Sequence, residues 1–279
     1  MSDSGFWRRF RRRIAAPATP ARAAAVPATT PAPAGAQAFD SVYSIFPDIE
    51  NLRQRPSYPD LADDESFWSV VERARPYTML SVEALYELYQ AVRYVAASGV
   101  EGDLVECGVF MGGSVFAAAE WAHGLGLSGR RIFLYDTFAG FPPGTAAETD
   151  AFGNVVPFYS HPNFLAVARE LIARSSWPAE GFVFVEGDVA RTLALTRPER
   201  IALLRLDTDV YASTRVELEQ LYPLLTPGGV LMIDDYGSFQ GARRATDEFL
   251  AGVRPAPLLH RVSQGVRSGL KPASPGRLP

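Results

Sequence analysis

Four aspartates follow directly on two apolar runs of the chain, and these are the residues that could do chemistry. The runs are residues 201–206 and 230–233, and the acids after them are Asp207, Asp209, Asp234 and Asp235. A short apolar run bounded by glycine, proline or charge is typical of a buried parallel strand. Ligands of open α/β sheets bind just beyond the carboxyl ends of such strands, so we expect these acids at one edge of one sheet.

Carboxylates gathered in this way repel one another and lose hydration energy unless a proton or a cation lies between them. Their oxygens are hard ligands, which suit Mg²⁺, Ca²⁺ or Mn²⁺. The alternative is that each aspartate only caps a strand or begins a helix, and Asp235 fits that alternative best. Because two separate strands end in the same way, we favour a cation site.

The composition suits one α/β domain with a tail, since the chain has 279 residues, 47% of them hydrophobic, and a formal net charge of −4. The single cysteine, Cys107, cannot form an internal disulfide, so nothing points to an oxidising compartment. No apolar run approaches the length of a membrane span, and the early arginines are not followed by the apolar core of a signal peptide. We therefore expect a cytoplasmic protein without stable membrane insertion.

Residues 1–36 have the composition of a disordered tail, a basic segment at residues 6–14 followed by Pro, Ala and Thr. The tail holds six arginines and one aspartate, a charge of +5 that leaves −9 for the remaining chain. Its basic aromatic start could touch anionic lipid or nucleic acid, although a solvated terminus is the simpler interpretation. The acidic body argues against a broad nucleic-acid-binding face, so we expect no nucleic-acid partner.

Helical patterns precede the first strand. Two helices are predicted, over residues 66–73 and 81–98, the second with Ser81 as its N-cap and Gly99 as its C-cap. We interpret residues 37–100 as an N-terminal helical cover on the sheet that follows.

Strand patterns then alternate with helical patterns, which indicates βαβ units and a doubly wound, mostly parallel sheet. The predicted strands are residues 103–107, 131–135, 182–186, 201–206 and 230–233, with a final pair at 258–262 and 266–270. The predicted helices are residues 115–123, 162–175, 213–225 and 241–251. Ser213 or Thr214 would cap the third of these helices, with Glu217 at capping-box distance from Thr214. We predict a Rossmann-like domain over residues 101–279.

A glycine-rich turn at residues 108–113 joins the first strand to a helix, so a ligand could approach the backbone N–H groups there. Asp136 ends the next strand, where a carboxylate can accept hydrogen bonds from a ribose diol, and Asp188 could reach the base. The turn has no Lys or Arg for a phosphate, which disfavours NAD and ATP. An acidic pocket with Glu106 suits the sulfonium cation of S-adenosylmethionine. The residues assigned to this nucleoside site are Glu106, Gly108, Gly112, Gly113, Asp136 and Asp188.

Several motifs together resemble the macrocin O-methyltransferase (TylF/MycF-type) family. They are residues 106–114 (ECGVFMGGS), residues 206–214 (LDTDVYAST), the LYP, PGG and IDDY groups within residues 221–236, and residues 77–79 (YTM). The resemblance covers about residues 63–270. It leaves the tail and residues 137–160 unexplained, and residues 186–190 depart from the family's usual aromatic-containing stretch.

The resemblance implies a class I methyltransferase fold, S-adenosylmethionine, Mg²⁺ and methylation of a sugar hydroxyl, often on a natural product. By match to the motifs, Asp207, Asp234 and Asp235 would hold the metal and Asp209 would be the general base. Thr78, Met79 and Ser114 would join the cofactor site.

A sugar hydroxyl is a poor nucleophile, so this reaction needs an acidified hydroxyl and a nearby base. His161 is the alternative base to Asp209, since it follows a long segment, residues 137–160, that could form a lid over the acceptor. Two other functions stay open: a metal-dependent O-methyltransferase of a catechol or phenolic acceptor, and a non-catalytic S-adenosylmethionine-binding protein that assembles with a pathway partner. The expected acceptor is a small-molecule glycoside or sugar, and the sequence leaves homo-oligomer formation open.

Overall fold

The computed structural model describes residues 58–156 and 163–273. The chain divides into two units, Met1–Ala32 and Pro33–Pro279, and all described residues belong to the second. The predicted tail and His161 lie outside the described residues, as does the first part of the predicted helical cover. The predicted domain boundaries at residues 36 and 100 therefore stay predictions.

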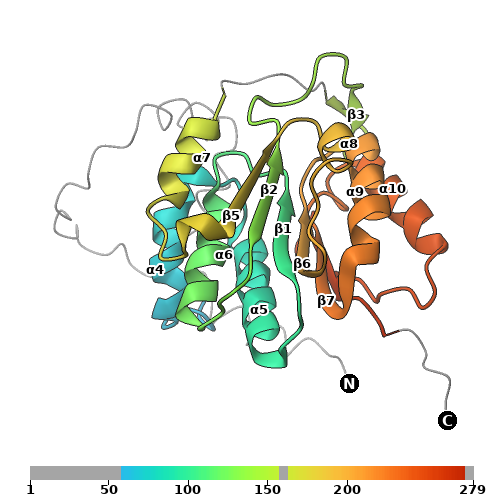
Figure 1. Cartoon of the computed structure of the whole chain (residues 1–279). Coiled ribbons are helices and arrows are strands. Elements are labelled where there is room, and N and C mark those ends of the chain that lie inside the picture. Colours follow the sequence, from blue (N-terminus) through green and yellow to red (C-terminus); the bar gives the residue numbers. More distant parts are fainter. Residues whose placement is uncertain (1–57, 157–162, 274–279) are drawn as a thin grey trace, which may run out of the picture. The chain divides into compact units, whose positions relative to one another are not determined.

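Seven strands form one sheet in the order β5-β2-β1-β6-β7-β9-β8 (Figure 1). The parallel strands are β1 (Asp103–Cys107), β2 (Ile132–Asp136), β5 (Phe182–Glu186), β6 (Ile201–Leu206) and β7 (Leu225–Ile233). The last pair, β9 (Arg267–Leu270) and β8 (His260–Arg261), adds antiparallel to β7. The predicted doubly wound, mostly parallel sheet is confirmed.

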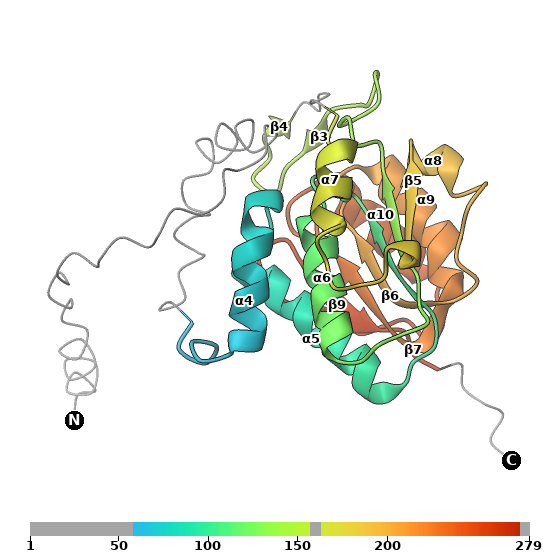
Figure 2. The same cartoon turned by 60° about the vertical axis from the view of Figure 1, so that its left-hand side comes forward.

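Helices cover both faces of this sheet (Figure 2). One face carries α4 (Glu65–Ala74), α5 (Val82–Ser98), α6 (Gly113–Gly124) and α7 (Leu165–Ile172). The other face carries α8 (Val189–Thr192), α9 (Tyr211–Leu221) and α10 (Gln240–Ala251). Short 3₁₀ turns lie at η2 (Arg75–Tyr77), η3 (Ala179–Gly181) and η4 (Tyr222–Leu224).

The strands are buried on both faces because their side chains alternate between two hydrophobic clusters. In β6, Leu203 packs with the cluster under α4 to α7, whereas Leu204 and Leu206 pack with the cluster under α9. This alternation fixes the register of each strand, so residues just after the strand ends meet at one edge of the sheet.

The helical cover holds the glycine-rich turn from one side. The side chain of Ser81 caps α5 by accepting from Ala84 N at 3.2 Å, and Gly99 ends the helix with φ 67°. In α4, Phe67 is fully buried and stacks on Trp121 of α6 at a centroid distance of 5.7 Å. The cover is therefore packed against the helix that begins in the turn.

The predicted helix over residues 213–225 is wrong at both ends. The helix α9 begins at Tyr211, and Thr214 Oγ1 donates to Val210 O at 3.0 Å within it, so Thr214 is not an N-cap. Glu217 is buried in the helix rather than part of a capping box. The helix stops at Leu221, and Pro223 lies in the 3₁₀ turn that follows, since proline lacks the N–H that would continue it.

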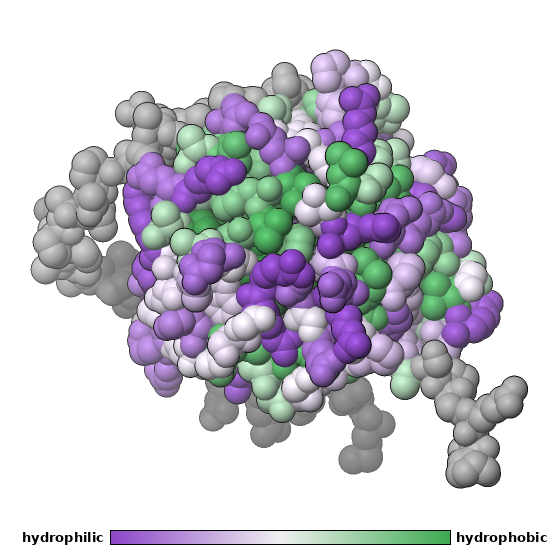
Figure 3. Space-filling view, viewed as in Figure 1, coloured by the Kyte–Doolittle hydropathy of each residue, from purple (hydrophilic) through white to green (hydrophobic). Residues whose placement is uncertain are grey.

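Hydrophobic residues gather in the middle of the face seen in Figure 3, where Figure 1 places β2 and β5. The strand β5 is the edge of the sheet, and Phe182, Val183 and Phe184 are only partly buried there. Among the described residues, no helix is long and apolar enough to cross a membrane.

Candidate active site

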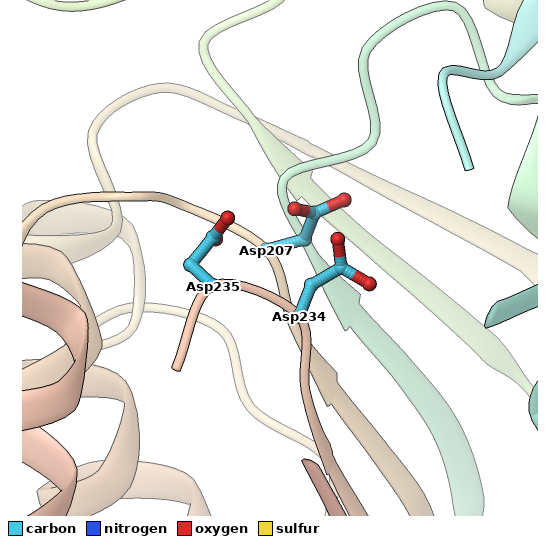
Figure 4. Close-up of side chains that lie close together, drawn as sticks. All are labelled: Asp207, Asp234 and Asp235. Carbon is cyan, nitrogen blue, oxygen red and sulfur yellow. The ribbon is translucent and has the colours of Figure 1, made fainter. Parts of the chain in front are cut away.

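The predicted acids meet at the carboxyl edge of β6 and β7. Asp207 follows β6 and donates its N–H to Cys107 O at 2.9 Å, and Asp234 follows β7 and donates to Leu206 O at 2.9 Å. One ligand oxygen from each of Asp207, Asp234 and Asp235 lies within 4.8 Å of the others. Figure 4 shows these side chains beside one another at the ends of neighbouring strands.

This cluster fits a divalent cation. Its donors are carboxylate oxygens, which Mg²⁺ prefers, and Asp235 is 7% exposed. Burial raises the pKa of Asp207 and Asp235 well above the ordinary value; Arg205 opposes this shift at Asp207, while neighbouring acids raise the pKa of both residues. Asp234 Oδ1 is buried, and Arg205 Nη2 lies 2.9 Å from it. A cation among these oxygens would relieve their repulsion.

Asp209 reaches the cluster by a backbone turn after β6. Its φ of 62° is left-handed, a conformation that aspartate tolerates better than most residues. Its N–H donates to Asp235 Oδ2 at 3.0 Å, so the turn places it beside Asp235. Burial, and then the charge of Asp207, raises the pKa of Asp209 to about 7. A nearby cation would lower that pKa and keep the carboxylate ionised.

Arg205 is the largest difference between the predicted and the observed site. It points to the same edge as Asp207, is 1% exposed, and contacts acids from three neighbouring strands. Nη1 lies 2.9 Å from Glu106 Oε1, and Nη2 lies 2.7 Å from Asp207 Oδ2 and 2.9 Å from Asp234 Oδ1. Sequence reasoning treated Arg205 as part of an apolar run. The signal that could have found it is a charged residue inside a strand buried on both faces.

The glycine-rich turn lies directly beside the acids. A side chain at Gly108 would place its Cβ 1.7 Å from Asp207 O, and φ there is 84°, so only glycine fits. A Cβ at Gly113 would lie 2.6 Å from the carbonyl of Tyr77, which places residues 77–79 against the start of α6. Gly112 has φ 88° and forms the N-cap of α6. Close backbone approach therefore explains Gly108 and Gly113, and a left-handed φ explains Gly112.

Asp136 organises this turn. Its Oδ2 accepts hydrogen bonds from Val109 N at 2.6 Å and Phe110 N at 2.7 Å, and its Oδ1 accepts from Phe138 N at 2.7 Å. Thr137 Oγ1 is a more distant donor, at 3.5 Å from Oδ1, so a carboxylate with about four acceptor positions keeps some capacity for a ribose hydroxyl. The predicted ribose acceptor thus also anchors the backbone of the nucleoside site.

Glu106 and Ser114 form a buried polar pair behind the turn. Ser114 Oγ donates to Glu106 Oε1, which also accepts from Arg205 Nη1, and both residues are 4% exposed. Burial raises the pKa of Glu106, while Arg205 and Ser114 act in the opposite direction. Glu106 therefore connects the predicted cofactor residues to the acids of β6 and β7.

The other predicted cofactor residues are less closely joined to this network. Asp188 is the N-cap of α8 and accepts from Ala190 N at 2.9 Å, which is the helix-capping role. Gly187 N donates to Asp136 O at 2.8 Å, so Asp188 lies near the same edge. Thr78 is buried against Gly113, whereas Met79 is 46% exposed.

The predicted lid contains a small hairpin, β3 (Glu148–Thr149) and β4 (Val155–Val156), beside the acids. Glu148 Oε1 accepts from Tyr211 N at 2.9 Å, two residues beyond Asp209, and Ala151 N donates to Ser238 O at 2.8 Å. A cleft of about 440 Å³ lies between the hairpin and α10. Its lining residues are Glu148, Thr149, Ala151, Gln240, Gly241, Arg243, Arg244, Asp247 and Glu248.

Glu217 is a second buried acid that sequence reasoning assigned to another role. It is 0% exposed, and its Oε2 accepts a hydrogen bond from Thr208 Oγ1 at 3.1 Å. Thr208 is the residue between Asp207 and Asp209 in the sequence. Burial raises its pKa to about 8, although the hydrogen bond from Thr208 opposes this. The side chain is therefore protonated at neutral pH.

This protonation predicts how stability depends on pH. An acid whose pKa is raised in the folded state stabilises the fold at low pH and loses that contribution as pH rises to about 8. Glu217→Gln keeps the neutral form, so its stability relative to the native protein should rise by roughly 4 kcal/mol between pH 5 and pH 9. Urea unfolding of both proteins in EDTA measures this difference, and a difference that is flat with pH would contradict it.

The sheet order, the glycine turn after the central β1 and the acids after β2, β6 and β7 define a class I, Rossmann-like methyltransferase fold. The family model described as Macrocin-O-methyltransferase (TylF) matches residues 62–260. The chain belongs to this family, which confirms the predicted resemblance.

Individual relatives agree with that assignment. The 8-demethyl-8-(2,3-dimethoxy-alpha-L-rhamnosyl)-tetracenomycin-C 4'-O-methyltransferase of Streptomyces olivaceus is 36% identical over 165 residues, 57% of this chain and 62% of that protein. This chain thus spans less than two thirds of that relative. The mycinamicin III 3''-O-methyltransferase of Micromonospora griseorubida is 31% identical over 178 residues, 62% of this chain and 70% of that protein. The solved structure of the O-methyltransferase NovP superposes with a TM-score of 0.62 at 25% identity, over 71% of this chain and 83% of that chain.

Proposed function

We propose that this protein is an S-adenosylmethionine-dependent O-methyltransferase that methylates a sugar hydroxyl of a glycosylated natural product or other glycoconjugate, with Mg²⁺ at Asp207, Asp234 and Asp235. The observation that carries the proposal is the placement of these acids and Asp209 directly beside the glycine turn at Gly108. A methyl donor on the turn and a hydroxyl on the acids would be neighbours, which in-line transfer requires.

Different residues would act on the methyl donor and on the acceptor hydroxyl. Asp136 fixes the turn that would hold the nucleoside, and Glu106 lies behind it as a buried acid. A cation held by the acids of β6 and β7 would acidify and orient the acceptor hydroxyl. Asp209, beside Asp235, would take the hydroxyl proton on its carboxylate as the methyl group is transferred.

The acceptor class rests on a relative, because the name of the tetracenomycin-C 4'-O-methyltransferase includes a rhamnosyl group. The cleft between the hairpin and α10 offers carboxylates, guanidinium groups and an amide, which suit the hydroxyls of a glycoside. We propose that residues 137–160, of which the structure describes 137–156, cover this acceptor. We also propose the cytoplasm as the compartment, since the only cysteine is a buried free thiol.

The function is tested by incubating the protein with methyl-labelled S-adenosylmethionine, Mg²⁺ and panels of acceptors. Label on a sugar oxygen of a glycoside supports the proposal. Label on a catechol or phenol alone would support a phenolic O-methyltransferase. Tight cofactor binding without transfer to any panel, including nucleotide sugars and glycolipids, would support a non-catalytic protein.

Asp136 gives a separate test of the cofactor site. Asp136→Ala should weaken S-adenosylmethionine binding about tenfold or more, because hydrogen bonds to a charged acceptor contribute about 1.5–3 kcal/mol each. Calorimetric titration measures the dissociation constant. The matched control is Asp103→Ala at the amino end of β1, where the carboxylate also accepts from a backbone N–H, that of Arg131. An unchanged affinity in Asp136→Ala would count against the assigned site.

A further inference from the structure

A buried guanidinium group lies beneath the acids at the sheet edge. Arg205 contacts Glu106 of β1, Asp207 after β6 and Asp234 after β7, all within 2.9 Å. These strands are neighbours in the sheet, so a single side chain joins the cofactor side of the site to its cation side.

Burial of a guanidinium group is costly unless its charge is paired and its N–H groups are bonded. The charge of Arg205 is paired through Nη1 and Nη2 because the acids lie at fixed positions around it, whereas its buried Nε has no hydrogen-bond partner among the described residues. Its planar fork presents N–H groups in set directions, which a lysine ammonium group on a flexible stem does not reproduce. The arrangement therefore ties the positions of Asp207 and Asp234 to one rigid group.

The contacts also leave ligand oxygens for a cation. Arg205 engages Oδ2 of Asp207 and Oδ1 of Asp234, and it does not engage the second oxygen of either carboxylate. Groups that hold metal ligands from behind orient them, and their loss commonly weakens metal binding by about 10–100-fold. One fixed positive charge also reduces the number of cations that the surrounding acids can hold.

We propose that Arg205 is a positioning residue for the cation site, one that holds Asp207 and Asp234 at the spacing for a single divalent ion and links them to Glu106. The inference rests on the proposed function in one respect, that these aspartates are the ligands. It adds a residue that touches neither the ion nor either substrate.

The test is Mn²⁺ binding to the whole protein without cofactor or acceptor, measured as free Mn²⁺ by electron paramagnetic resonance. The native protein should bind one ion per chain. Arg205→Lys keeps the positive charge but loses the planar guanidinium group. The dissociation constant of the variant for Mn²⁺ should therefore rise about tenfold or more. The matched control is Arg131→Lys, whose ion pair with Asp103 at 3.0 Å lies at the opposite edge of the sheet.

The outcomes separate this inference from the proposed function. If the native protein binds no Mn²⁺, the cation site and this inference both fail. If the native protein binds Mn²⁺ and folded Arg205→Lys binds it within about twofold as tightly, Arg205 is only structural and this inference alone fails. A lower melting temperature in Arg205→Lys with unchanged Mn²⁺ affinity has the same meaning.

A measurement on the native protein covers the case in which Arg205→Lys does not fold. With ¹⁵N-labelled arginine, a guanidinium group held by three acids should give slowly exchanging Nη signals. One equivalent of Mn²⁺ should broaden those signals, because the ion would lie next to the carboxylates that Arg205 contacts. Slowly exchanging guanidinium signals that Mn²⁺ leaves sharp would overturn the proposal.

Discussion

Chelation of divalent ions should stop methyl transfer by this protein, and Mg²⁺ should restore it. Ligand oxygens of Asp207, Asp234 and Asp235 lie within 4.8 Å of one another, and without a metal ion the repulsion that Arg205 leaves uncompensated favours uptake of protons. A sugar hydroxyl is then not acidified, a loss of several kcal/mol of transition-state stabilisation that corresponds to a fall of about 10³-fold or more. Turnover in EDTA, with metal content verified, measures the effect, and full turnover there would refute the cation site.

A ligand variant separates this effect from a general need for salt. Asp234→Asn keeps the shape of the side chain but removes one charge from the cluster. Mg²⁺ raises the melting temperature of a protein that binds it in the folded state only, so the native protein should be stabilised and the variant should not. Asp63→Asn, at an exposed acid before α4, is the control and should respond to Mg²⁺ as the native protein does.

The sheet could be predicted from the sequence because the local signals agree with one another. Strands β1, β5 and β6 have the predicted bounds, since each is a mostly apolar run that is followed by glycine or aspartate. The ends of α9 could not be predicted in this way. Ser213 and Thr214 have the right types for an N-cap, but Tyr211 N finds its acceptor in Glu148, which is 63 residues away in sequence.

The candidate site could likewise be predicted only in part from the sequence. Spacing after strands was enough to gather Asp207, Asp234 and Asp235, because sheet topology brings strand ends together. It could not show that Arg205 lies among them or that Asp136 binds the backbone of the turn, since these contacts depend on which face each side chain takes. The placement of Asp209 depends on one left-handed residue, which no sequence pattern of strand or helix indicates.

Asp209→Asn should lower turnover by about 10²-fold or more, the scale of general-base catalysis, while binding of cofactor and metal stays nearly intact. Asparagine suits this test because it shares the tolerance of aspartate for a left-handed backbone, here φ 62°. The N–H of residue 209 would still donate to Asp235 Oδ2, so the loop keeps its anchor. What the variant loses is the carboxylate that accepts the proton.

Rates at saturating cofactor and Mg²⁺, with Mn²⁺ and S-adenosylmethionine affinities measured on the same preparation, decide the role of Asp209. A reduced rate with unchanged affinities identifies the carboxylate as the base, whereas weakened Mn²⁺ binding would make Asp209 a ligand or a support for Asp235. His161→Gln is the companion variant, because His161 is the other candidate base that the sequence offers. If Asp209→Asn is nearly as fast as the native protein and His161→Gln is slow, the proton goes to the histidine. If both variants are fast, the acceptor hydroxyl needs no side-chain base, since a cation at the three aspartates would then acidify it enough for its proton to pass to water.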